Sequence, residues 1–331
     1  MPFPALLLAL QLADTLTARV AFRLAEDSPR TPAFLGEVSG FTFDRSGRLF
    51  VSDIAEAKVL VFGTDGRALG TIGRRGKGPG ELEAPTGPVI GPDGSLFVRD
   101  MSAVERFTVD PTTGLPTRRG QGFAGPMYAP WRSFQPSVID AEGRFHFPQE
   151  VGRNDGKTHV TFRRYALDGK ALDSIPVPLF PTSRSSFASV AVSPGTGRMV
   201  TGIATVPFHP HPAWAVTPRG TIIAGAATSD SLQETDAGGR VVRRLGAGAL
   251  PPRIGARERA ESARAFARRL DTLPVPVERI YGLSEESKAR RLPERVPAFV
   301  NVIIADDGTP WLQRWPTGAA TLFTALRPDG R

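Results

Sequence analysis

The residues best suited to bind a ligand recur at one position of a repeated sequence pattern. Each lies in a short polar loop that follows an alternating apolar segment and precedes another. Polar groups and an aromatic ring that converge on a concave surface are the usual components of a binding site. These candidates are Asp53, Asp100, Glu150, Asp230, Arg314 and Trp315.

Two of the candidates, Asp53 and Asp100, have a second interpretation that the sequence favours. A carboxylate at the end of a strand can accept hydrogen bonds from backbone N–H groups of its own loop, which stabilises the loop and leaves no carboxylate for a ligand. We keep both interpretations for this pair. No residue of the chain is predicted to be catalytic.

The four histidines supply one chelating pair, His209 and His211, with Pro210 between them. A zinc site needs three or four converging ligands, and the other histidines, His146 and His159, belong to a different repeat. In the alternative interpretation, the prolines around the pair form a rigid extended crossover that the imidazole rings line. We therefore expect no cofactor, and keep a divalent metal such as calcium or zinc as the alternative.

The composition and the motifs exclude several classes of chemistry. The chain has no cysteine, which excludes disulfides and thiolate catalysis. It has no Gly-x-Ser-x-Gly or His-Glu-x-x-His motif, and the glycine-rich segment 73–80 lacks the Lys-Ser/Thr of a phosphate loop. The net charge is +8, but the arginines are scattered along the chain, so we predict no nucleic-acid partner.

The candidate residues are positioned by a repeat that is clearest at 41–66, 89–114 and 213–239. Each copy has an alternating apolar strand, a tight turn ending in Gly, a second strand, a polar loop, a third strand and a second Gly turn. A repeat of about 40–50 residues with this content is typical of a β-propeller, in which each repeat forms one four-stranded blade. We predict an all-β, six-bladed propeller whose second-to-third loops place the candidates on one face.

The same pattern assigns most of the remaining chain. Residues 134–177 are predicted to form a third blade, and residues 187–205 a hairpin that is either a degenerate fourth blade or an added edge. Residues 298–331 begin a last blade that lacks its fourth strand. We predict that the strand at 15–24 supplies it by pairing with 321–327, which closes the ring and removes two exposed sheet edges.

A helical excursion at 253–293 precedes the last blade. Ala263, Phe266 and Leu270 have the spacing of one apolar helix face. Residues 283–292 carry acidic residues first and basic residues last, as the helix dipole favours. About 40 residues are too few for an independent core, so we predict two short helices that pack against the propeller.

The N-terminal residues 1–14 form an apolar run of the length found in signal peptides, although they lack a basic start. The alternative interpretation is a buried first strand. We expect an exported, periplasmic or extracellular monomer in which residues 15–331 form one propeller domain. No apolar run reaches the ~18 residues of a transmembrane span.

The segment GRRGKGPGELEAP at 73–85 and the Val-x-Asp triplets at 51–53 and 98–100 resemble the NHL-type six-bladed propellers. That family has a glycine-rich linker ending in Gly-Glu-aromatic before each blade, and here a leucine replaces the aromatic residue. Residues 206–220 and 293–308 further resemble a bacterial, mostly exported and largely uncharacterised subgroup of these propellers. The resemblance implies the fold and export, and it implies no activity.

The leading functional prediction is a non-catalytic exported propeller that binds a small-molecule ligand or a protein partner on one face of the ring. The alternative is a metal-dependent propeller enzyme of lyase or lactonase type. In gluconolactonase-like propellers a central calcium is held by Glu, Asn and Asp. A comparable site here would use Asn301, which lies in the predicted inner strand of the last blade.

Overall fold

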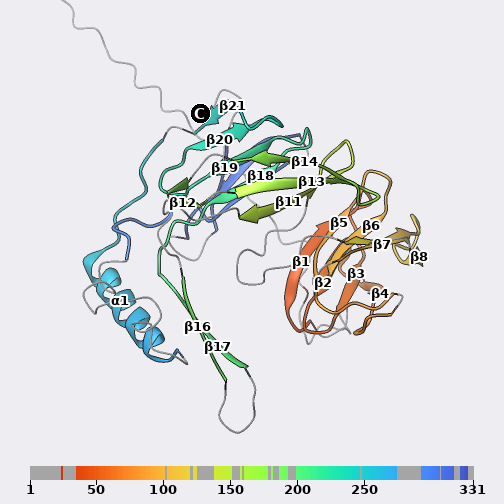
Figure 1. The fold of residues 1–331 in the computed structure, drawn as a ribbon, viewed down its shortest axis with the longest axis horizontal. Coiled ribbons are helices and arrows are strands. Elements are labelled where there is room, and N and C mark those ends of the chain that lie inside the picture. The colour runs from red at the N-terminus through yellow and green to blue at the C-terminus, as the bar shows by residue number, and fades with distance from the viewer. Residues whose placement is uncertain are drawn as a thin grey trace, which may run out of the picture.

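The described residues of the structure, a computed structural model, form an all-β propeller with one α-helix, so the predicted fold class is confirmed (Figure 1). The described residues are 24, 35–78, 80–100, 103–119, 122–124, 138–150, 157–158, 160–177, 180–181, 186–192, 199–246, 248–273, 292–305, 307–316 and 321–326. The predicted strand at 15–24 falls outside them, apart from its last residue, so ring closure by that strand stays a prediction.

Five antiparallel sheets form the blades. The first blade contains β1 (Val38–Phe43), β2 (Leu49–Asp53), β3 (Lys58–Phe62) and β4 (Ala68–Ile72). The second contains β5 (Pro85–Ile90), β6 (Leu96–Asp100), β7 (Ala103–Val109) and β8 (Pro116–Arg119), and β9 (Phe123–Ala124) also pairs with β7. The third contains β10 (Val138–Ile139), β11 (Arg144–Glu150), β13 (Val160–Ala166) and β14 (Ala171–Pro176).

Two further blades and two short pairs complete the described strands. The penultimate blade contains β18 (Ala213–Val216), β19 (Ile222–Gly225), β20 (Leu232–Thr235) and β21 (Val241–Leu245). The last blade contains β22 (Asn301–Ile304), β23 (Pro310–Gln313) and β24 (Phe323–Ala325). The pairs are β12 (Lys157–Thr158) with β15 (Phe180–Pro181), and β16 (Ser186–Val192) with β17 (Met199–Thr205).

The turn between the first two strands is built in the same way in every blade. Its glycine has a positive φ, between 77° and 83°, and the glycine N–H donates to the carbonyl three residues earlier. A residue with a side chain is strained at such a φ, whereas glycine is not. The repeated glycines of the sequence therefore mark these turns: Gly47, Gly94, Gly143, Gly220 and Gly308.

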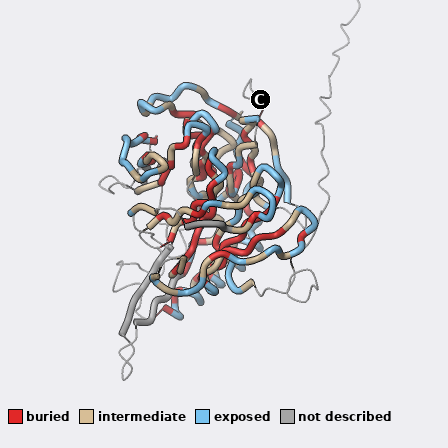
Figure 2. Tube along the Cα trace, turned by 90° about the vertical axis from the view of Figure 1, so that its right-hand side faces the viewer, coloured by how far each residue is buried: buried red, intermediate tan, exposed pale blue. Residues whose placement is uncertain are grey.

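The core lies between the blades, because each sheet packs one apolar face on its neighbour. Buried residues gather along the strands in the middle of the molecule, and exposed ones follow the outer loops (Figure 2). The second and third blades meet through an aromatic cluster in which the rings of Phe97 and Phe145 lie 5.0 Å apart. The penultimate and last blades meet through a cluster that includes Leu232, Phe299 and Leu312.

The predicted count of six blades is not matched, because the described residues form five. The third blade packs directly on the penultimate one: the rings of Phe162 and Trp214 lie 4.6 Å apart, and the Ala141 N–H donates to the Pro218 carbonyl. The hairpin predicted at 187–205 exists as β16–β17, but it extends away from the blades (Figure 1). The sequence analysis left two interpretations of this hairpin open, a degenerate fourth blade or an added edge. Because the third and penultimate blades are in direct contact, the described hairpin is not a blade between them.

The predicted helix around Phe266 is confirmed as α1 (Ala256–Asp271). Its buried face, which includes Phe266 and Leu270, packs on Ala204 and Val206 at the end of the hairpin. The helix thus docks on the hairpin, whereas the sequence analysis placed it against the propeller. The second helix, predicted at 283–292, lies outside the described residues except for Leu292, which joins the same cluster.

Replacing Phe266 with alanine is expected to loosen α1 from the hairpin, because this side chain is 3% exposed. Losing a buried phenylalanine costs about 3 kcal/mol or more. Hydrogen exchange should accelerate for the amides of 257–270 and change little in the strands of the blades. Arg264→Ala, exposed on the same helix, is the control. Unchanged exchange in the Phe266 variant would contradict this docking.

Three turns share an Asp-x-x-Gly-Arg motif, in which the aspartate binds the arginine at the end of the motif. Two of these turns join the first and second strands of a blade, and one joins the third and fourth strands. One carboxylate oxygen of the aspartate accepts backbone N–H groups of the turn, and the other accepts the Nε–H of the arginine. The pairs are Asp44 with Arg48, Asp140 with Arg144, and Asp236 with Arg240. Part of the high arginine content therefore stabilises turns.

The Asp140 copy of this motif is buried and bridges two blades. Its side chain is fully buried, and Oδ2 lies 2.8 Å from both the Arg144 Nε and the His146 Nε2. Burial alone would raise the pKa of Asp140, but the hydrogen bonds from His146 and Arg144 outweigh it and lower the pKa to about 2. Gly220 of the penultimate blade lies directly over this carboxylate.

Substituting alanine for Gly220 is expected to destabilise the contact between the third and penultimate blades. The added Cβ would lie 2.6 Å from the Asp140 Oδ2 and 2.8 Å from an Arg144 nitrogen. Gly94→Ala is a matched control, since Gly94 has nearly the same φ and no heavy atom within 4 Å of that position. The control should cost about 1 kcal/mol from backbone strain alone. Equal losses in urea unfolding would contradict the steric argument.

Stability should fall in acid through Asp140. Its folded pKa is depressed, so its contribution is present above about pH 4 and is lost as the pH falls toward about 2. The shift corresponds to about 2 kcal/mol. Asp140→Asn should therefore cost about 2 kcal/mol more at pH 4.5 than at pH 2, measured by urea unfolding. Asp236→Asn, in the more exposed copy of the motif, should show a smaller difference. A pH-independent cost of Asp140→Asn would refute this linkage.

Candidate functional site

The six predicted binding residues occupy equivalent places in their blades. Asp53, Asp100 and Glu150 are the last residues of β2, β6 and β11, which are the second strands of the first three blades. Asp230 lies between β19 and β20. Arg314 and Trp315 directly follow β23. All six thus lie at the end of a second strand or in the connection that follows it. That they bind a ligand stays a prediction.

The carboxylates of Asp53 and Asp100 are used inside the fold. Asp53 is fully buried and accepts backbone N–H groups of Gly36 at 2.7 Å, and of Glu37 and Glu56 at 3.1 Å. Asp100 accepts those of the two residues that precede β5, at 2.6 and 2.9 Å. Both aspartates thus attach the segment that enters a blade to its second strand. A ligand-binding role for them stays a prediction that this geometry does not support.

The structure describes fewer contacts for Glu150 and for the pair of His209 and His211. The backbone of Glu150 pairs with Val160, and its side chain is outside the described part of the chain. The rings of His209 and His211 lie 5.0 Å apart, and His209 is buried. Among the residues that the structure describes, no group of three or more His, Cys, Asp or Glu could hold a metal.

Asn301, the candidate for a calcium site, is at the start of β22. Its Oδ1 accepts the N–H of the following residue, Val302, at 2.9 Å. A calcium ligand set takes six to eight oxygens, chiefly carboxylates and carbonyls. The described contacts of this amide are local, so they offer no support for its predicted role as a ligand.

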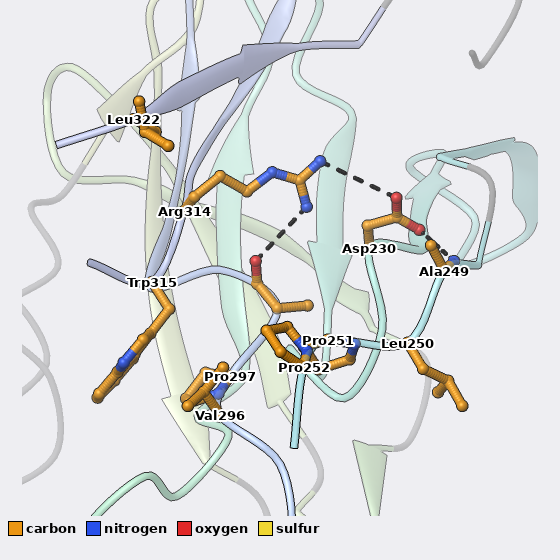
Figure 3. A pocket seen from close by; sticks show the side chains of 11 residues that line it. Asp230, Ala249, Leu250, Pro251, Pro252, Val296, Pro297, Arg314, Trp315 and Leu322 are labelled. Carbon is orange, nitrogen blue, oxygen red and sulfur yellow. Dashed lines mark hydrogen bonds and ion pairs between the residues drawn. The ribbon is translucent and has the colours of Figure 1, made fainter. Parts of the chain in front are cut away.

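Asp230, Arg314 and Trp315 come together at one pocket of about 290 Å³ (Figure 3). Asp230 comes from the penultimate blade, and the other two come from the last blade, so the pocket lies where these blades meet. The segment after β21, the segment before β22 and the residue before β24 supply the remaining wall. That wall is apolar and rich in proline: Ala249, Leu250, Pro251, Pro252, Val296, Pro297, Ala298 and Leu322.

Each charged side chain of the pocket is held by the backbone or by a neutral group. The Arg314 Nε donates to the Thr324 hydroxyl at 2.9 Å, and its Nη1 lies 3.5 Å from the Ala298 carbonyl oxygen. The Asp230 Oδ1 accepts the Ala249 N–H at 2.7 Å. The nearest atoms of the two charges, Nη2 and Oδ2, lie 3.9 Å apart, beyond hydrogen-bonding distance (Figure 3).

Trp315 is packed against Phe208, a contact that the sequence analysis did not predict. The ring centroids lie 5.7 Å apart. Phe208 has a φ of 56°, in the left-handed region that residues other than glycine rarely adopt. Such strained positions cluster at functional sites. The available signal was the proline-rich segment around His209, which the sequence analysis considered for its histidines, for an extended crossover and for a family resemblance, but not for Phe208.

The described chain contains no helix that is long and apolar enough to cross a membrane.

Comparison with known proteins supports the fold and leaves the activity open. A family model described as a 6-bladed beta-propeller matches residues 34–107, which include the first blade and the first two strands of the second. A comparison with curated proteins gives no match. The structure is similar to that of a protein of unknown function from Bacteroides caccae, with a TM-score of 0.42 and 13% identity, covering 85% of this chain and 72% of the other.

Two enzymes are also among the similar solved structures. A streptogramin B lyase has a TM-score of 0.38 and 11% identity, covering 85% of this chain and 78% of the lyase. An inactive virginiamycin B lyase from Staphylococcus aureus, solved with quinupristin, has a TM-score of 0.36 and 11% identity, covering 87% of this chain and 83% of the lyase. Likenesses this weak carry no argument about the function of this chain.

Proposed function

We propose that this protein is a non-catalytic β-propeller that binds a small ligand in the pocket between its penultimate and last blades. The observation that carries the proposal is the convergence of Asp230, Arg314 and Trp315. These residues were selected from the sequence by their place in the repeat, and three of the six line the same pocket.

The form of the pocket favours a small molecule over a protein partner. At about 290 Å³ it lies just below the usual range for small-molecule sites, which begins at about 300 Å³, so it suits a small ligand. Such sites combine an apolar wall with a few oriented polar groups. Here prolines and Trp315 form part of the wall, while the Ala249 N–H holds the Asp230 carboxylate and the Thr324 hydroxyl holds the Arg314 guanidinium.

A metal-dependent enzyme stays the alternative prediction, and no described observation raises it to a proposal. His209 and His211 are two ligands, whereas a catalytic zinc site uses three protein ligands. The charged pair of the pocket has a function in binding that requires no metal, because it can orient a polar ligand directly. We therefore base the proposal on the pocket and not on the histidines.

A screen of small polar and amphipathic fragments by ligand-observed NMR tests the proposal. Some fragments should bind, and Trp315→Ala should weaken them at least about tenfold, as loss of an aromatic contact at the centre of a site does. Arg257→Ala is the control, because that arginine is 91% exposed on α1. Fragments that bind the Trp315 variant and the wild type equally would show that the pocket is not the binding site.

A further inference from the structure

We infer that the ligand of this pocket is a small zwitterion of the α-amino-acid type with an apolar side chain. The inference rests on the proposed function and specifies its ligand. Its basis is the ion pair of Arg314 and Asp230, 3.9 Å between Nη2 and Oδ2, in an otherwise apolar pocket, in which each charged group keeps hydrogen-bonding capacity that its described contacts do not use (Figure 3).

The Arg314 guanidinium offers a site for a carboxylate. It has five N–H donors in a planar fork, and its described contacts are with Thr324 through Nε and with the Ala298 carbonyl through Nη1. The Nη2 edge has the Asp230 Oδ2 at 3.9 Å, too far for a hydrogen bond. A carboxylate at this edge would form charge-assisted hydrogen bonds, which are shorter and stronger than neutral ones.

Asp230 offers a matching site for an ammonium group. Its Oδ1 accepts the Ala249 N–H at 2.7 Å, which holds the carboxylate in place, and Oδ2 keeps lone pairs for a further donor. An α-amino acid carries its ammonium and carboxylate groups on one carbon atom. The two groups can therefore reach Asp230 and Arg314 at the same time.

The pairing of charges also determines which ligands the pocket disfavours. A simple anion at Arg314 would be repelled by Asp230, and a simple cation at Asp230 would be repelled by Arg314. A ligand with both charges satisfies both side chains. An internal peptide segment has neither charge, and a peptide terminus has one of the two, so the arrangement favours a free amino acid.

The apolar wall accounts for the remainder of the ligand. Pro251, Pro297 and Trp315 also line the pocket, with the Trp315 ring directed away from the charged pair (Figure 3), and the rim carries Leu250 and Leu322, which are 66% and 54% exposed. These surfaces would cover an aliphatic or aromatic side chain and remove it from water. A polar side chain would gain no such contact, so phenylalanine or leucine should bind more tightly than glycine.

Isothermal titration calorimetry of the full chain with four probes tests this inference. L-phenylalanine should bind, whereas glycine, N-acetyl-L-phenylalanine and L-phenylalaninamide, which lack the side chain, the ammonium group and the carboxylate respectively, should each bind at least about tenfold more weakly. Asp230→Asn should weaken L-phenylalanine but not the N-acetyl compound. Arg314→Gln should weaken L-phenylalanine but not the amide. Arg257→Gln is the control variant.

The outcomes separate this inference from the proposed function. Equal binding of L-phenylalanine and its N-acetyl or amide form would overturn the zwitterion while leaving a ligand-binding pocket. If a fragment binds in a way that depends on Trp315 but no amino acid binds, the zwitterion is likewise overturned and the ligand-binding pocket remains. Failure of both fragments and amino acids would overturn both proposals. If a variant does not fold, the four probes on the wild-type chain still decide the question.

Discussion

The packing of one apolar sheet face on the next is the interaction on which the rest of the structure depends. A blade buries both faces only when it has a neighbour on each side, and the clusters around Phe97, Phe162 and Phe299 are these contacts. Removing a large apolar surface from water is the dominant favourable contribution to folding. The loops that carry the candidate residues have positions only because this packing holds the blades in register.

Polar groups determine two features that apolar packing does not specify: how each entering segment is attached to its blade, and how the turns close. Asp53 and Asp100 each bind backbone N–H groups that lie 16 and 17 residues earlier, so they attach each incoming segment to its blade. At the other end, aspartate–arginine pairs close the turns, and Asp140 adds a contact to the next blade. Part of the arginine content thus has a structural use, because three of the arginines are held at turns.

The candidate site is a consequence of the contact between two blades. The carboxylate of the pocket comes from the penultimate blade and the guanidinium from the last, so neither blade contains the site alone. Phe208 adds a third segment, since its ring packs on Trp315 from the crossover that leads into the penultimate blade. A site built in this way is oriented by the sheets on either side, with its carboxylate held by a backbone N–H and its guanidinium by a threonine hydroxyl.

The sequence by itself determined what depends on local pattern. Alternating apolar residues and positive-φ glycines predicted the strands and turns, and the spacing of Phe266 and Leu270 predicted α1. The repeat also placed Asp230 and Arg314 in equivalent loops. Tertiary structure decided the rest: the hairpin extends away from the blades, Asp53 and Asp100 are buried in backbone contacts, and Asp230 meets Arg314 in one pocket. These outcomes depend on which sheet faces pack together. The sequence does not specify the pairing of faces, because every repeat has similar apolar faces.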